Sequence, residues 1–310
     1  MNAIPVNKRT DLALEVHELN TEQGKDDGII TREENIDDII VTTAEIKEGK
    51  GEELSGKSAG IYITVDVGRV WQYDSVRFNK IAKILSNQLK KLLPEGDGTV
   101  LIAGLGNENI TADSIGPKII EGIIVSHHIK VLNRELYDKI GFSDVAAFAP
   151  GVLGQTGIES AEIIKSVAEK ANPSCIIVID ALSSRRLARL ATTVQIADSG
   201  IAPGSGVNNS RARLDKTTLG VPVISIGIPT VVDAATLAYD LIEEVSKKEN
   251  VAMTISEEVL NKSLTENSRN FFITPKETDV IIKSGAKLLS TALNMALHKN
   301  LPPEEIPEYL

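Results

Sequence analysis

The sequence lacks features that several large classes of protein require. It has one cysteine, Cys175, which excludes a disulfide framework and a cysteine-based zinc site. Because Cys175 opens an apolar run, we expect a buried structural thiol there. Lys and Arg number 33 against 43 Asp and Glu, and the net charge of −10 argues against direct binding to nucleic acid. No signal-peptide core is present, and no uncharged apolar run approaches the roughly 18 residues of a membrane span. These absences indicate a soluble, cytoplasmic protein.

Familiar catalytic and cofactor motifs are missing as well. Gly104 and Gly106 begin a dinucleotide fingerprint, but Asn109 stands where the third glycine belongs. His127 and His128 fall near the end of an expected helix, away from the strand-end loops, so we interpret them as surface or core residues. No H-E-x-x-H motif or Ser-His-Asp pattern appears. The sequence therefore predicts neither a metal nor a cofactor.

What is present is an alternation of strand-like and helix-like segments. A chain of 310 residues that is 42% hydrophobic can bury a substantial core. The alternation predicts an α/β fold with a mostly parallel sheet and helices on both faces, preceded by an N-terminal extension containing strands. Strands are predicted at 38–43 and 60–66 in the extension and then at 99–104, 176–180, 192–197 and 221–228. Helices are predicted at 78–93, 112–125, 161–171, 234–245 and 278–298.

Two of the predicted strands lead into aspartates. The run at 100–105 ends in a glycine turn, and Asp113 follows just before or within the next helix; the run at 176–179 stops at Asp180. Carboxyl ends of parallel strands meet at one edge of a sheet, where ligands bind. Two carboxylates brought together there share a proton and are suited to acid–base chemistry. Either aspartate could instead cap a helix or order its loop.

Several separate motifs resemble one family in the same order along nearly the whole chain, from Arg9 to His298. This family is the germination proteases of spore-forming bacteria. The motifs are GLGNENITADSIGP, FAPGVLGQTGIES, VIDALSSRRLARL, DSGIAPGSGVNNSR, LGVPVISIGIPTVVDA and FFITPKETD.

The resemblance implies an atypical aspartate-dependent endopeptidase that degrades small acid-soluble spore proteins during germination. It implies a fold akin to the hydrogenase-maturation endopeptidases, a homotetramer and a location in the forespore or spore core. The two essential aspartates of the family fall on Asp113 and Asp180, the residues that the strand ends also single out.

The N-terminus adds a prediction about processing. The family cleaves after the first Glu of a motif close to Thr-Glu-Phe-Ala-Ser-Glu, and Thr10–Glu15 matches it in residue type at all positions except Leu14. The resemblance therefore implies that residues 1–11 are a propeptide removed by self-cleavage between Asp11 and Leu12. Residues 12–310 would form a single α/β protease domain.

The expected mechanism needs an activated water and a proton donor, which an aspartate pair supplies when one member is protonated. Backbone N–H groups of the turn formed by Gly104, Gly106 and Asn107 are candidate donors to the developing oxyanion. Arg185 and Arg186 could bind an acidic side chain before the scissile bond, or lie at the surface.

Two other functions stay open at the level of sequence. One is a metal-dependent maturation-type protease of the same fold, which a chelator would inactivate. The other is a non-enzymatic ligand-binding protein, against which the substrate-like N-terminus argues.

Overall fold

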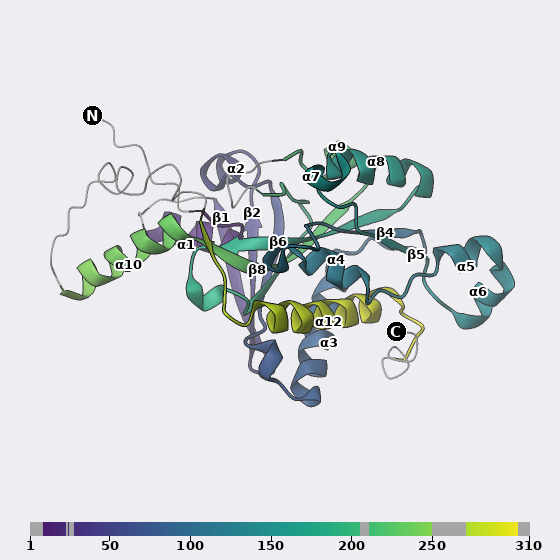
Figure 1. The fold of residues 1–310 in the computed structure, drawn as a ribbon, viewed down its shortest axis with the longest axis horizontal. Coiled ribbons are helices and arrows are strands. Elements are labelled where there is room, and N and C mark those ends of the chain that lie inside the picture. Colours follow the sequence, from purple (N-terminus) through teal and green to yellow (C-terminus); the bar gives the residue numbers. More distant parts are fainter. Residues whose placement is uncertain (1–8, 23, 25–27, 205–210, 250–270, 303–310) are drawn as a thin grey trace.

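The computed structural model describes residues 9–22, 24, 28–204, 211–249 and 271–302. Within them, nine strands form one sheet in the order β1-β2-β3-β7-β8-β6-β4-β5, with β9 paired to β8 (Figure 1). The strands are β1 (Ile29–Ile36), β2 (Ile39–Ile46), β3 (Gly60–Asp66), β4 (Val100–Gly104), β5 (Val145–Phe148), β6 (Cys175–Ser184), β7 (Thr193–Ala197), β8 (Val223–Asp233) and β9 (Phe272–Ile273).

The sheet has a parallel part and an antiparallel part. Strands β8, β6, β4 and β5 are parallel neighbours, whereas β1, β2, β3 and β7 pair antiparallel, as do β7 with β8 and β8 with β9. The α/β class predicted from the sequence is confirmed, but the antiparallel part is larger than expected. The strands of the N-terminal extension join the main sheet through β3, which pairs with β7.

Helices cover both faces of the sheet, as predicted. The long helices α3 and α12 pack with α4 against one face, and α8 packs against the other (Figure 1). The strands alternate accordingly: Ile102 and Ile177 belong to the first core, and Leu101 and Ile176 to the second. The helices are α1 (Ala13–Glu22), α2 (Lys50–Ser55), α3 (Ser75–Leu92), α4 (Ile115–Ile120), α5 (His127–Leu132), α6 (Arg134–Ile140), α7 (Leu153–Thr156), α8 (Ser160–Ala171), α9 (Lys216–Leu219), α10 (Ala234–Glu249) and α12 (Thr278–Leu297).

Local sequence explains the two long core helices. Asp74 caps the start of α3 by accepting the N–H of Arg77 (2.9 Å), and the buried apolar positions of α3 recur at helical spacing before Pro94. By length and hydropathy alone α12 could cross a membrane, but 67% of the qualifying window is buried inside the protein. Burial in the core therefore accounts for its apolar character.

Some element boundaries differ from the sequence prediction. Strand β6 continues four residues past Asp180 to Ser184, because β8 also continues and keeps pairing with it beyond a bulge after Leu182. The helix expected at 112–125 is shorter: a 3₁₀ turn (Thr111–Asp113) precedes α4, which ends at Ile120.

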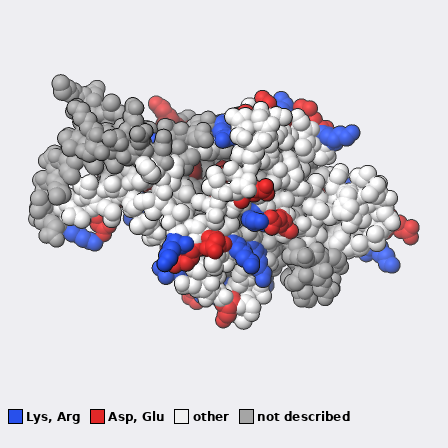
Figure 2. Space-filling view, in the orientation of Figure 1, with Lys and Arg blue, Asp and Glu red and all other residues white. Residues whose placement is uncertain are grey.

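On the face shown in Figure 2, basic and acidic side chains are interspersed, so neither sign of charge dominates it.

Candidate active site

The two aspartates selected from the sequence line one cavity just beyond the carboxyl end of β4 and beside the middle of β6. The cavity has a volume of about 470 Å³. Gly104 of β4 lies beside Ile179 of β6, so the loop that follows β4 starts next to Asp180. Apolar side chains form much of the remaining wall, among them Ile110, Val152, Ala161, Leu214 and Phe272.

Asp113 is held by the turn that precedes it. Its Oδ2 accepts the N–H of Asn107 (2.8 Å), and it does not cap α4, whose first turn has no side-chain cap. Burial raises the pKa of Asp113 above its ordinary value, although the Asn107 hydrogen bond and the positive charge of Arg211 oppose this. A carboxyl group in this position stays protonated to a higher pH than a surface aspartate.

Asp180 is the more strongly perturbed member of the pair. It is 7% exposed, and its Oδ1 accepts the N–H of Ala181 (2.9 Å). Burial raises the pKa of Asp180 well above its ordinary value, and the negative charges of Asp113 and Asp11 raise it further. The two carboxyl groups therefore share a cavity, and the charge of Asp113 influences the protonation of Asp180.

The glycine turn shapes this site. Gly106 lines the cavity with φ of 115°, and a Cβ there would lie 1.9 Å from the backbone oxygen of Asp113. A Cβ on Gly104 would lie 2.4 Å from the backbone oxygen of Gly116, so that glycine lets α4 pack closely on β4. The Asn107 N–H is already donated to Asp113, so in this structure it does not serve as the free oxyanion donor that the sequence suggested.

Arg211 is a cavity residue that the sequence reasoning missed. Its positive charge lowers the pKa values of both aspartates, in opposition to their burial, and its Nη1 lies 3.9 Å from Glu159 across the cavity wall. Arg211 is the last residue of the motif DSGIAPGSGVNNSR, but nothing in that motif singled it out as a site residue. Part of that stretch, including Ser205 and Gly206, lies outside the described residues.

Arg185 and Arg186 do not line the cavity, and they face helix α1 instead. The backbone N–H groups of both donate to Glu15, at 2.6 and 3.0 Å, and the Arg186 side chain pairs with Glu22 at 2.7 Å. Arg189, which sequence reasoning overlooked, pairs with Glu18. The acidic side chains that these arginines contact thus follow the predicted cleavage site rather than precede it.

The segment that contains the predicted cleavage site lies on the body of the protein. The Asp11 N–H donates to the Ser183 carbonyl and the Ser183 N–H donates to Asp11 Oδ2, both at 2.8 Å. Leu12 and Ala13 are completely buried. Arg9 pairs with the buried carboxylate of Asp233 at 3.1 Å. The first eight residues of the predicted propeptide lie outside the described part of the chain.

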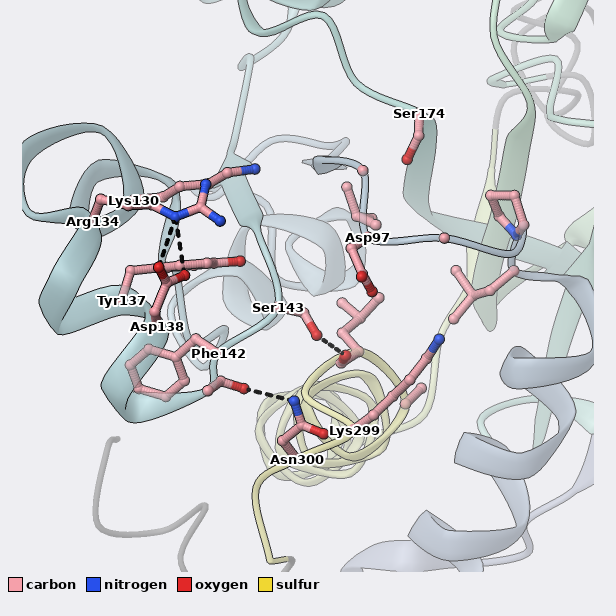
Figure 3. A pocket seen from close by; sticks show the side chains of 18 residues that line it. Asp97, Lys130, Arg134, Tyr137, Asp138, Phe142, Ser143, Ser174, Lys299 and Asn300 are labelled. Carbon is pink, nitrogen blue, oxygen red and sulfur yellow. Dashed lines mark hydrogen bonds and ion pairs between the residues drawn. The ribbon is translucent and has the colours of Figure 1, made fainter.

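The opposite end of the parallel strands carries a different arrangement. His127 begins α5, and its Nδ1 lies 2.8 Å from Asp144, which also accepts from Lys130 and Thr99. A second cavity of about 300 Å³ lies nearby; Figure 3 shows Arg134 paired with Asp138 on its wall. Among the residues that the structure describes, no group of three or more His, Cys, Asp and Glu side chains could hold a metal ion.

Cys175 is buried in β6, and burial raises the pKa of its thiol to about 12. It is therefore a structural thiol rather than a thiolate nucleophile.

A half-buried and a buried carboxyl group with raised pKa values, lining one cavity of an α/β sheet, are typical of an enzyme that moves protons during hydrolysis. The sequence profile of the germination proteases matches residues 7–268. The chain belongs to this family and is therefore a peptidase. It is 41% identical to the germination protease of Caldanaerobacter subterraneus over 97% of this chain and 98% of that protein. The germination protease of Clostridium tetani is 42% identical over 97% of this chain and 99% of its own length.

A structural resemblance was also found to the NiFe hydrogenase maturation protease HycI of Thermococcus kodakarensis. It has a TM-score of 0.38 and 18% sequence identity, and it covers 68% of this chain and 98% of that one.

Proposed function

We propose that this peptidase is made as a self-processing zymogen and cleaves small acid-soluble spore proteins during germination, with Asp113 and Asp180 activating the water. The observation that carries the proposal is the placement of these two aspartates in one cavity, each with a raised pKa. We further propose that the enzyme acts in the spore core as a homotetramer and needs no metal.

The asymmetry of the pair suggests how the proton is distributed. Asp180 is the more deeply buried, and the charge of Asp113 disfavours its ionised form. The proton therefore resides mainly on Asp180, which protonates the leaving amine, while Asp113 accepts a proton from the attacking water. The two groups titrate as a unit, so the assignment describes the prevailing form of the pair.

The N-terminal segment supports self-processing. Each end of the hexamer Thr10–Glu15 is fixed, by Asp11 on Ser183 and by Glu15 on the backbone of Arg185 and Arg186. The Asp11 carboxylate lies close enough to raise the pKa of Asp180. No residue from Arg9 to Glu15 lines the aspartate cavity, so the segment is bound beside the pair and a local rearrangement must precede cleavage.

The test is self-cleavage of the purified full chain, followed by N-terminal sequencing over a series of pH values. We expect a new N-terminus at Leu12 and a rate that increases as the pH falls below neutral, because the pair works in its singly protonated form. Asp113→Asn and Asp180→Asn should each abolish the reaction, and Asp11→Lys should suppress it by changing the recognised residue. Cleavage at another bond, or a rate that climbs toward alkaline pH, would contradict the proposal.

A further inference from the structure

Gln195 contacts the backbone on both sides of the bond predicted to be cleaved. Its Nε2 donates to the carbonyl oxygen of Asp11 (3.1 Å), and its Oε1 accepts the N–H of Ala13 (2.8 Å). The Asp11 carbonyl belongs to the Asp11–Leu12 peptide bond itself. A single side-chain amide thus pairs with this stretch of main chain as a neighbouring strand would.

The sheet fixes Gln195 in this position. Gln195 lies in the middle of β7 and is 7% exposed. It is paired with Gly227 of β8, and Gly227 is paired with Asp180 of β6. Directly opposed residues on adjacent strands point to the same face, so Gln195 and Asp180 share a face. Neighbouring strands lie about 4.8 Å apart, which places their backbones about 10 Å from one another.

Gly227 separates the two without a side chain of its own. A Cβ there would lie 2.5 Å from Cγ of Leu182, so the glycine leaves room for Leu182 to lie across this row. Leu182, Gln195 and Asp11 also line a small cavity of about 80 Å³ together with Gly227. The segment therefore crosses the face of the sheet between Gln195 and the strand that carries Asp180.

We infer that Gln195 is a further catalytic residue of self-processing, which orients the Asp11–Leu12 peptide bond and donates a hydrogen bond to its carbonyl oxygen as negative charge develops there. This inference rests on the proposed function. When water adds to the Asp11 carbonyl carbon and gives a proton to Asp113, the carbonyl π electrons move to the oxygen. Gln195 Nε2 keeps its hydrogen bond to this oxygen through the local rearrangement that brings the bond to the aspartate pair. Collapse of this intermediate breaks the C–N bond, and the Leu12 nitrogen leaves as an amine after protonation by the aspartate pair. This role also explains why Gln195 is buried and why its Nε2 and Oε1 both contact the N-terminal segment of the same chain.

The experiment compares self-cleavage rates of full-length variants. Gln195→Glu keeps the acceptor for Ala13 but removes the donor to Asp11, and we expect it to slow cleavage on the order of 10²-fold. Gln195→Ala should slow it at least as much. Ala13→Pro removes the N–H that Gln195 accepts, at the first position of α1, where proline is compatible with a helix. It should slow cleavage about tenfold.

The decisive measurement is the double variant, because Ala13→Pro should have no further effect when Gln195 is already alanine. Gln88→Ala, a buried glutamine of α3 on the other face of the sheet, serves as the matched control and should leave the rate unchanged. Thermal unfolding of each variant shows that it is folded.

Three results would overturn the inference. The first is a wild-type rate for Gln195→Glu while Asp180→Asn is inactive. The second is an equal effect of Ala13→Pro in the wild type and in Gln195→Ala. The third is faster cleavage in Gln195→Ala, which would mean that Gln195 inhibits cleavage of the bond. Undiminished cleavage in Asp113→Asn or Asp180→Asn would instead contradict the proposed function.

Discussion

Asp144 and Asp180 are both almost fully enclosed by protein, and they lie level with opposite ends of β4. Asp144 precedes β5 and accepts hydrogen bonds from Thr99, Lys130 and His127. Burial alone would raise the pKa of Asp144, but these three partners together lower it below its ordinary value. Burial raises the pKa of Asp180, and the nearby negative charges add to the effect.

The opposite pKa shifts of Asp144 and Asp180 distinguish a buried carboxylate suited to a structural role from one suited to proton transfer. A carboxylate that is surrounded by cationic and hydroxyl donors is stable as an anion and holds its neighbours together. A carboxyl group that is buried beside another carboxylate keeps its proton to a higher pH than an isolated one. Asp144 is thus stabilised as an anion, whereas the pKa of Asp180 is raised. The following predictions test whether only Asp180 has the catalytic role that we propose for it.

The largest expected effect is on activity. Asp180→Asn should lower the self-cleavage rate by at least about 10²-fold, because the acid–base partner is lost. Asp144→Asn should leave the rate of the folded protein close to that of the wild type. The measurement is the initial rate of appearance of the Leu12 N-terminus at equal concentrations of folded protein. A comparable loss in both variants would end the distinction between the two aspartates.

Two glycines with similar φ angles lie on either side of β4 in the sequence. Gly106 has φ of 115° and Gly96 has φ of 112°, but a Cβ would clash at 1.9 Å with Asp113 at the first and meet nothing within 4 Å at the second. Gly96→Ala should therefore cost only about 1–3 kcal/mol of backbone strain. Gly106→Ala should cost at least about 4 kcal/mol and displace Asp113. Chemical denaturation measures both, and equal losses would show that the turn tolerates a side chain.

The two aspartates should affect stability with opposite signs. At neutral pH Asp144→Asn should lower the unfolding free energy by about 2 kcal/mol, because charge-assisted hydrogen bonds are lost. Asp180→Asn should raise it, because the folded state no longer disfavours an ionised group. Denaturation in urea from pH 3 to pH 8 measures both differences.

The pH dependence follows from the direction of each pKa shift. The lowered pKa of Asp144 gives stability that is present above the unfolded value of about 3.9 and is lost as the pH falls through the folded value. The raised pKa of Asp180 costs stability as the pH rises from about 3.9 toward its folded value. Both variants should therefore approach the wild type in strongly acidic solution. A difference that grows on acidification would contradict the assignment.

The smallest expected effect is that of a chelator. Prolonged treatment with EDTA should leave self-cleavage unchanged, since a carboxyl pair can activate water without a metal. The readout is the cleavage rate before and after dialysis against metal-free buffer. Loss of activity that zinc or nickel restores would favour the metal-dependent alternative. The contrast between Asp144 and Asp180 would then no longer explain the activity.

The sequence made much of this arrangement predictable. The apolar runs identified β4 and β6. Asp113 was identified in the loop that follows β4, and Asp180 as the polar residue at the end of the apolar run in β6. Helices α3, α8 and α12 were predictable because each has a long apolar face at regular spacing. The large antiparallel part was not, because the pairing of β3 with β7 depends on contacts between residues more than a hundred positions apart.

The sequence by itself determined the α/β class, the family and the two aspartates, because apolar periodicity and local motifs are properties of neighbouring residues. Only the tertiary structure decided that Arg211 borders the aspartate cavity, that Arg185 and Arg186 face helix α1, and that Gln195 contacts the predicted cleavage site. Gln195 and Asp11 are 184 positions apart, and no local pattern links a glutamine in a strand to a peptide bond near the N-terminus. Their contact follows from the order of strands in the sheet, which is set by burial of the whole core.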